Sequence, residues 1–112
     1  EDKARAIAAS EKLHCRISFT EEFPATINHD EGVDILEQAA LDGGLMMRHL
    51  PEAFRWSEDF GHYLRHCDGA YFGLGAGEDT PQLHNPEYDF PDQIISAGIK
   101  MFYAIYEHIL KS

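Results

Sequence analysis

The spacing of apolar residues predicts several helices in this chain. A weak apolar face runs from about residue 2 to residue 13, in a stretch rich in Ala, Glu and Lys. Between about residues 30 and 41, apolar side chains recur at positions i, i+3 and i+7, after two acids that favour the electropositive start of a helix. The strongest stripe follows Pro91 and predicts a core-facing helix. It consists of Ile95, Ile99, Phe102, Tyr106 and Ile109, widened by Ile94 and Ile105.

A further helix of about ten residues is predicted to begin at Ser57. Serine is a favourable N-cap, and Glu58 and Asp59 follow it where acids interact well with the helix dipole. The apolar residues of this segment recur with helical spacing up to a turn at 68–69, and they are Phe60, Tyr63, Leu64 and Cys67.

Two other stretches have the pattern of strands. Residues 15–20 alternate apolar and polar side chains, which is typical of a half-buried strand, and Pro24 marks its end. Residues 70–74 are small and aromatic and predict a buried strand. Residues 45–56 have an ambiguous pattern, for which we expect a short strand followed by a loop around Pro51. Because helices and strands alternate, we expect a mixed α/β (α+β) fold.

Composition and charge narrow the class of protein. A chain of 112 residues with 44% hydrophobic residues is typical of one globular domain. Nine basic against 20 acidic residues give a net charge of −11, which would repel nucleic acid and anionic membranes, so we expect neither as a partner. The longest apolar run is far too short to cross a bilayer, and no signal segment opens the chain, so we expect a cytoplasmic protein. Its two cysteines, Cys15 and Cys67, are too few for a disulfide scaffold.

Seven histidines raise the question of a metal site, because neutral imidazole is a common metal ligand. His62 and His66 lie four residues apart, but on the helix face opposite the apolar stripe, where solvated side chains are the usual case. His29 follows Asn28 in a loop, and a loop histidine is more often a surface residue. His84 is the best candidate, because a loop containing Pro86 can present its imidazole at low entropic cost. One histidine cannot hold a catalytic metal by itself.

Three segments together resemble the C-terminal part of the M20 metallopeptidase family, in particular its N-acyl-amino-acid amidohydrolases of the hippurate hydrolase type. They are residues 57–60 (Ser-Glu-Asp-Phe), 69–77 (Gly-Ala-Tyr-Phe-Gly-Leu-Gly-Ala-Gly) and 83–90 (Leu-His-Asn-Pro-Glu-Tyr-Asp-Phe). Residues 23–28 (Phe-Pro-Ala-Thr-Ile-Asn) resemble the segment in which the family's lid, or dimerisation, domain returns to its catalytic domain. The resemblance thus covers nearly the whole chain.

The resemblance implies a division of the chain and three site residues. Residues 1–29 would be the end of the lid domain with its hinge, and residues 30–112 the C-terminal part of the catalytic domain. His84 would correspond to the last ligand of a two-metal site, Asn28 would lie near the substrate carboxylate, and Gly75 would line the floor of the cleft. No catalytic residue is assigned within this segment.

The activity implied by the resemblance is hydrolysis of the amide bond of N-acyl amino acids or related small conjugates by a metal-activated water. The metal would be zinc or manganese, as one or two ions, and the protein a homodimer. The other metal ligands and the general base would lie outside these 112 residues, which alone would be inactive. A truncated, non-catalytic relative that serves as a folding or oligomerisation module is the alternative. A third hypothesis is an acidic interaction domain whose last apolar stripe binds a partner helix.

Overall fold

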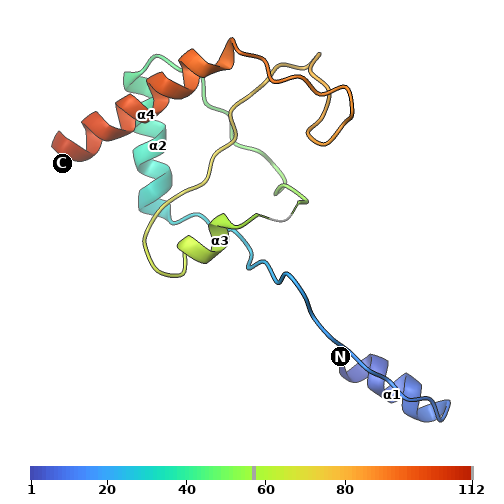
Figure 1. Cartoon of the computed structure of the whole chain (residues 1–112). Helices are drawn as coiled ribbons and strands as arrows, with labels where there is room; N and C mark the ends of the chain where they lie inside the picture. Colours follow the sequence, from blue (N-terminus) through green and yellow to red (C-terminus); the bar gives the residue numbers. More distant parts are fainter. Residues whose placement is uncertain (57, 112) are drawn as a thin grey trace.

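A computed structural model describes residues 1–56 and 58–111, and four helices form in these ranges. They are α1 (Asp2–Ser10), α2 (Asp30–Asp42), α3 (Phe60–Tyr63) and α4 (Ile94–Lys111). Helices α2 and α4 cross and pack together, whereas α1 lies apart at the end of an extended segment (Figure 1). None of the helices in the described ranges is long and apolar enough to cross a membrane.

The core lies where α2 and α4 cross. Ala39 is 0% exposed, and with its neighbour Ala40 it offers only methyl groups to the contact, so the two helix backbones can approach closely. Leu36 from α2 and Met101 from α4 complete the buried set in the described ranges. Partly buried residues pack around it, and they are Leu45, Ala70, Phe72, Ala104 and Ile105. One helix pair therefore organises the burial of apolar surface.

Local sequence signals account for the ends of the two packed helices. Two acids occupy the first turn of α2, where they interact favourably with its dipole, and the Gly43 N–H donates to the Ala39 carbonyl at 2.9 Å at the other end. In α4, the Ile94 N–H donates to the Pro91 carbonyl at 3.0 Å, so the proline leads into the helix. The helices predicted near residues 30–41 and after Pro91 are confirmed.

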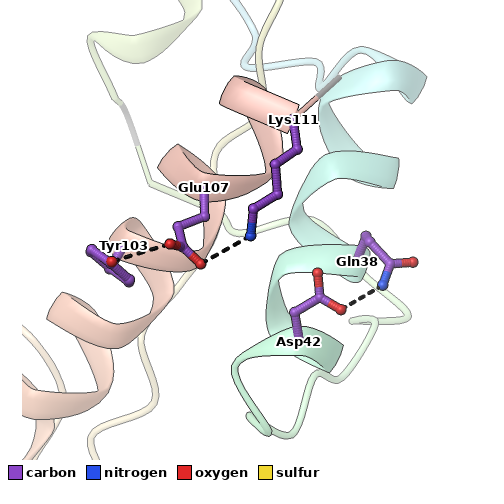
Figure 2. Close-up of polar contacts among 5 residues, drawn as sticks. All are labelled: Gln38, Asp42, Tyr103, Glu107 and Lys111. Carbon is purple, nitrogen blue, oxygen red and sulfur yellow. Dashed lines mark hydrogen bonds and ion pairs between the residues drawn. The ribbon is translucent and has the colours of Figure 1, made fainter.

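The polar contacts that Figure 2 draws on α2 and α4 join residues of the same helix. Gln38 Nε2 donates to Asp42 Oδ1 at 2.8 Å in α2. In α4, the Tyr103 hydroxyl donates to Glu107 Oε1 at 3.1 Å, and Lys111 Nζ lies 3.2 Å from Glu107 Oε2. Exposed pairs at this spacing stabilise a helix by only about 0.2–0.5 kcal/mol each. The contact between α2 and α4 thus depends on the apolar residues at their crossing.

The predicted mixed α/β fold is wrong, because residues 1–56 and 58–111 contain no strand. The alternating residues 15–20 lie in the extended segment after α1, where no second segment pairs with them in a ladder. Residues 45–56 are irregular as well. Residues 70–74 follow an extended path, but the polar groups around Tyr71 bond to side chains instead of a neighbouring strand. A strand needs a backbone partner, and alternation alone does not supply one.

The face of α4 that was predicted to be core is exposed. Ile99 and Phe102 are each 65% exposed, and the other large apolar residues of the stripe are also exposed, namely Ile95, Tyr106 and Ile109. The buried face centres on Met101 instead, with Ala104 and Ile105 beside it. Ala104 on this face leaves room for the alanines of α2, whereas the bulkier stripe would hold the two helices apart.

The helix predicted to start at Ser57 is also corrected. Ser57 lies outside the described residues, and the regular helix α3 is a single turn. Turns extend it through residue 66, with the Cys67 N–H donating to the Tyr63 carbonyl at 3.0 Å. An isolated short helix is unstable in water, so a favourable apolar spacing does not guarantee full helical length.

The described chain is elongated. Its radius of gyration is 20.0 Å, whereas a compact domain of this length has about 13 Å. The segment from α1 to residue 27 accounts for the long arm in Figure 1, and α1 buries none of its residues. The helix predicted near residues 2–13 is confirmed in a shorter form, Asp2–Ser10.

Gly32 sets how closely the first turn of α2 approaches another segment. A Cβ at this position would lie 2.7 Å from the Gly69 carbonyl carbon and 3.0 Å from the Ala70 nitrogen, both backbone atoms. Such distances are well inside van der Waals contact, so only glycine fits here without a shift of the backbone.

We predict that Gly32→Ala destabilises the protein although alanine is the better helix former. The gain in helix propensity is about 1 kcal/mol, and overpacking against fixed backbone costs about 1–3 kcal/mol. Urea unfolding followed by far-UV circular dichroism measures the balance.

The matched control is Gly98→Ala in α4, where the added Cβ would meet the end of the Leu74 side chain at 3.3 Å. Leu74 is partly exposed and can move aside, so this variant should be neutral or slightly stabilising. Equal destabilisation by both variants would contradict the interpretation of the Gly32 contact.

Candidate functional site

Segments far apart in the sequence meet beside the N-terminal end of α2, and Asn28 lies at their centre. Its Nδ2 donates to the Tyr71 carbonyl at 2.9 Å, and its Oδ1 accepts from the Tyr71 N–H at 2.8 Å. The two bonds fix which side of the amide carries the nitrogen. The candidate substrate residue Asn28 is thus tied to the segment that leads to Gly75, and its substrate contact stays a prediction.

His29 pairs with Gly69 in a similar way. The His29 backbone N–H donates to the Gly69 carbonyl at 3.0 Å, and the Gly69 N–H donates to Nδ1 of the imidazole at 3.1 Å. Nδ1 must be unprotonated to accept, so the proton of the neutral ring lies on Nε2. That atom lies 3.9 Å from Asp68 Oδ1. His29 is therefore a half-buried, bonded side chain and not the surface residue that a loop position suggested.

Tyr71 also contacts the segment around α3. Its hydroxyl donates to Glu58 Oε2 at 3.3 Å, and its ring lies 5.3 Å from that of Phe60, centre to centre. Burial of the phenol raises the pKa of Tyr71 above its usual value of 10.0, and the charge of Glu58 and the hydrogen bond to it act in the same direction. Tyr71 therefore stays a neutral hydrogen-bond donor over the physiological pH range.

Gly61 brings α3 against the segment before α2. A Cβ on this residue would lie 2.6 Å from the Pro24 carbonyl oxygen and 3.0 Å from that of Ala25. The backbone of α3 therefore lies against residues 24–25, and Tyr71 is held between α3 and Asn28. Sequence reasoning did not find this group, because the partners are 13 to 43 residues apart.

Gly75 lies four residues beyond Tyr71, in an exposed part of the chain. Apart from Gly75 and its two neighbours in the chain, no residue has an atom within 4 Å of the position that a Cβ would take there. Before it, Phe72 contacts Phe102 of α4 with ring centres 5.7 Å apart. The backbone at Gly75 is thus open to approach, while the chain just before it is anchored on α4.

His84 lies on the exposed loop that precedes α4. Its φ of 70° places it in the left-handed region, which costs an L-residue about 1–2 kcal/mol. The loop is closed by local bonds, in which the Asn85 N–H donates to the Gln82 carbonyl at 3.0 Å and the Glu87 N–H donates to Asn85 Oδ1 at 2.9 Å. The imidazole is therefore presented from a turn of defined shape.

The described ranges contain no group of three His, Cys, Asp or Glu side chains that could hold a metal ion. His84 is thus not joined by two further ligands there. His62 and His66 are exposed, in agreement with the solvated face predicted for them. His49 Nε2 lies 2.9 Å from Glu37 Oε1, an exposed pair between α2 and the loop that follows it.

We predict that Glu58→Gln lowers the pKa of Tyr71, because the substitution removes the charge that disfavours the phenolate. Ultraviolet absorbance measures tyrosine ionisation as a function of pH, and subtraction of the Tyr71→Phe curve isolates the Tyr71 signal. Since the folded-state pKa is raised, this group stabilises the fold below about pH 10, and the contribution is lost as the pH rises further.

The control for this titration is Glu52→Gln, which removes an exposed carboxylate paired with Arg55 and should leave the Tyr71 curve unchanged. A Tyr71 curve that does not move in Glu58→Gln would show that burial alone shifts the pKa.

Comparisons with known proteins cover nearly the whole chain. A probable hydrolase of Synechocystis sp. is 28% identical over 99 residues, which are 82% of this chain and 25% of that protein. A protein named as an uncharacterized hydrolase of Staphylococcus epidermidis is 23% identical over 114 residues, covering 97% of this chain and 29% of its own length. This chain thus spans about a quarter of the length of the curated relatives it matches. No solved structure matches it.

The family model of the peptidases M20/M25/M40 matches residues 5–108. This range includes the residues paired around Tyr71, the open backbone at Gly75 and the loop of His84. The predicted resemblance to the M20 family is confirmed, whereas the hippurate hydrolase type is not tested by these matches. The chain therefore belongs to the peptidase family M20/M25/M40.

Proposed function

We propose that this chain is one part of a longer, metal-dependent hydrolase that cleaves the amide bond of N-acyl amino acids or related small conjugates. The observation that carries the proposal is the family match over residues 5–108. The names of the two relatives support hydrolysis as the class of reaction. Because the chain spans about a quarter of each relative, the longer protein is itself part of the proposal.

The metal requirement is proposed for the longer protein. Members of this family generally bind divalent metal ions, and we propose zinc or manganese, as one or two ions. A catalytic zinc takes about three ligands from the protein, and the described residues of this chain do not assemble three. His84 is the ligand that we assign to this chain, and we assign no catalytic step to its residues.

Substrate contacts are proposed for Asn28 and Gly75. Gly75 is supported by the empty space beside its backbone, which lets a ligand approach closely. Asn28 uses one donor and one acceptor on Tyr71, so half of the bonding capacity of its amide is left for a substrate. The division at residues 29 and 30, with the end of a lid domain before it and catalytic domain after it, falls at the start of α2.

The partners and location follow the same proposal. A small N-acyl amino acid or conjugate is the ligand, and a cytoplasmic homodimer is the working form. The net charge of −11 argues against binding to nucleic acid or to an anionic membrane.

We predict that His84→Ala in the longer protein abolishes most of the hydrolysis of N-acyl amino acids. Loss of a metal ligand should lower activity at least about 100-fold, since even mutation of a residue that only hydrogen-bonds to a ligand lowers metal affinity or activity about 10–100-fold. Release of glycine from N-benzoylglycine in the presence of Mn²⁺ or Zn²⁺ measures activity, and elemental analysis of the purified protein measures retained metal.

Two variants test whether such a loss of activity is caused by removal of the His84 imidazole. His84→Gly also removes the side chain but suits the φ of 70°, so it should be as inactive as His84→Ala without the backbone cost. His62→Ala removes an exposed histidine of α3 and should keep activity and metal. Equal losses in His62→Ala and His84→Ala would overturn the assignment.

The intact mass of the natural protein separates the proposal from its alternative. A mass several times 12.7 kDa together with hydrolysis supports the enzyme. A mass of 12.7 kDa without hydrolysis supports a non-catalytic folding or oligomerisation module.

A further inference from the structure

We propose that Asn28 and His29 are positioning residues, which hydrogen-bond to the backbone of Tyr71 and Gly69 and thereby fix the place of residues 73–77 in the substrate site. We call these four hydrogen bonds the grip. The role in the substrate site rests on the proposed function, whereas the grip itself rests on contacts in this structure. The segment after α3 passes the N-terminal end of α2, where these contacts form (Figure 1).

The grip replaces the backbone ladder that residues 69–71 lack. The Asn28 amide presents one donor and one acceptor to Tyr71, as a peptide group would, and it bonds both backbone groups of Tyr71 at 2.9 and 2.8 Å. His29 bonds both backbone groups of Gly69, at 3.0 Å through its N–H and at 3.1 Å through Nδ1. Two adjacent residues thus satisfy four backbone groups, which sets the register of one segment against the other.

The position of His29 is fixed by the helix that it precedes. It is the N-cap of α2, and its carbonyl accepts from the Val33 N–H at 3.0 Å. Gly32, in the first turn of α2, lets the Gly69 backbone approach as closely as the His29 bonds require. Since α2 holds the core, the grip connects residues 69–71 directly to the most buried part of the chain.

The grip acts on the segment that contains Gly75. Beyond Tyr71, Phe72 packs against the core and lies 5.7 Å from Phe102, ring centre to ring centre. The segment is thus held at Gly69, Tyr71 and Phe72, and Gly75 follows three residues later with open space beside it. Loss of the grip would release Gly69 and Tyr71, and the Gly75 backbone would then no longer be held in one place for a ligand.

Hydrogen exchange of single amides in the longer protein tests the grip. In Asn28→Ala, the Tyr71 amide should exchange about tenfold faster, as expected for the loss of one such bond. His29→Asn and His29→Gln form a matched pair, because the asparagine oxygen can take the place of Nδ1 and the glutamine oxygen extends past it. The Gly69 amide should stay protected in His29→Asn and exchange about tenfold faster in His29→Gln. Gln38→Ala, which removes an exposed bond within α2, is the control and should change neither amide.

Steady-state kinetics with N-benzoylglycine tests the positioning role. His29→Gln should raise KM about tenfold with kcat changed less than about threefold, while His29→Asn stays near wild type. Asn28→Ala should raise KM as well, but Asn28 is also a proposed substrate contact, so the His29 pair decides the positioning role. Asn28→Asp keeps the size of the side chain but places an oxygen against the Tyr71 carbonyl in place of the Nδ2 donor. It should therefore raise KM as Asn28→Ala does. This second variant keeps the test valid where Asn28→Ala fails to fold.

Unchanged exchange at Tyr71 in Asn28→Ala and at Gly69 in His29→Gln would overturn the grip. Faster exchange with an unchanged KM would overturn the positioning role. A wild-type protein that hydrolyses no N-acyl amino acid would refute the proposed function, and with it the positioning role, while the exchange rates would still decide the grip.

Discussion

The close approach of α2 and α4 supports most of the remaining structure. It depends on Ala39 and Ala40, whose small side chains let Met101 reach the surface of α2. Segments outside the two helices are attached to this contact, because Leu45, Ala70 and Phe72 pack against its buried cluster. Exposed ion pairs along the helices add little by comparison. A bulky residue in place of either alanine would separate the two helices and remove the packing contact between their core and residues 70–72.

The positions of the long helices could be predicted from the sequence, because apolar spacing, acids at helix starts and Pro91 are local signals. The surface against which each helix face packs could not be predicted in this way. The apolar stripe through Ile99 and Phe102 is stronger than the buried face around Met101, yet the small residues of α2 select the second. The two predicted strands failed for a related reason, since alternation describes a half-buried surface but does not provide a neighbouring backbone.

The candidate site, too, could be predicted only in part from the sequence. His84, Asn28 and Gly75 were identified through a family resemblance, and the match over residues 5–108 supports that family without testing the three roles. The contacts of Tyr71 had no signal in the sequence, because Glu58 and Asn28 reach it from segments 13 and 43 residues away. A side-chain amide that pairs with a distant backbone has the same local pattern as an ordinary loop asparagine.

The crossing of α2 and α4 also determines when the chain can fold during synthesis. About 65 residues separate Leu36 from Met101. At a translation rate of about 5–20 residues per second, the apolar side of α2 emerges roughly 3–13 s before Met101 does. During that interval α2 has no Met101 to cover Ala39 and Ala40, so the nascent chain exposes its future core to water.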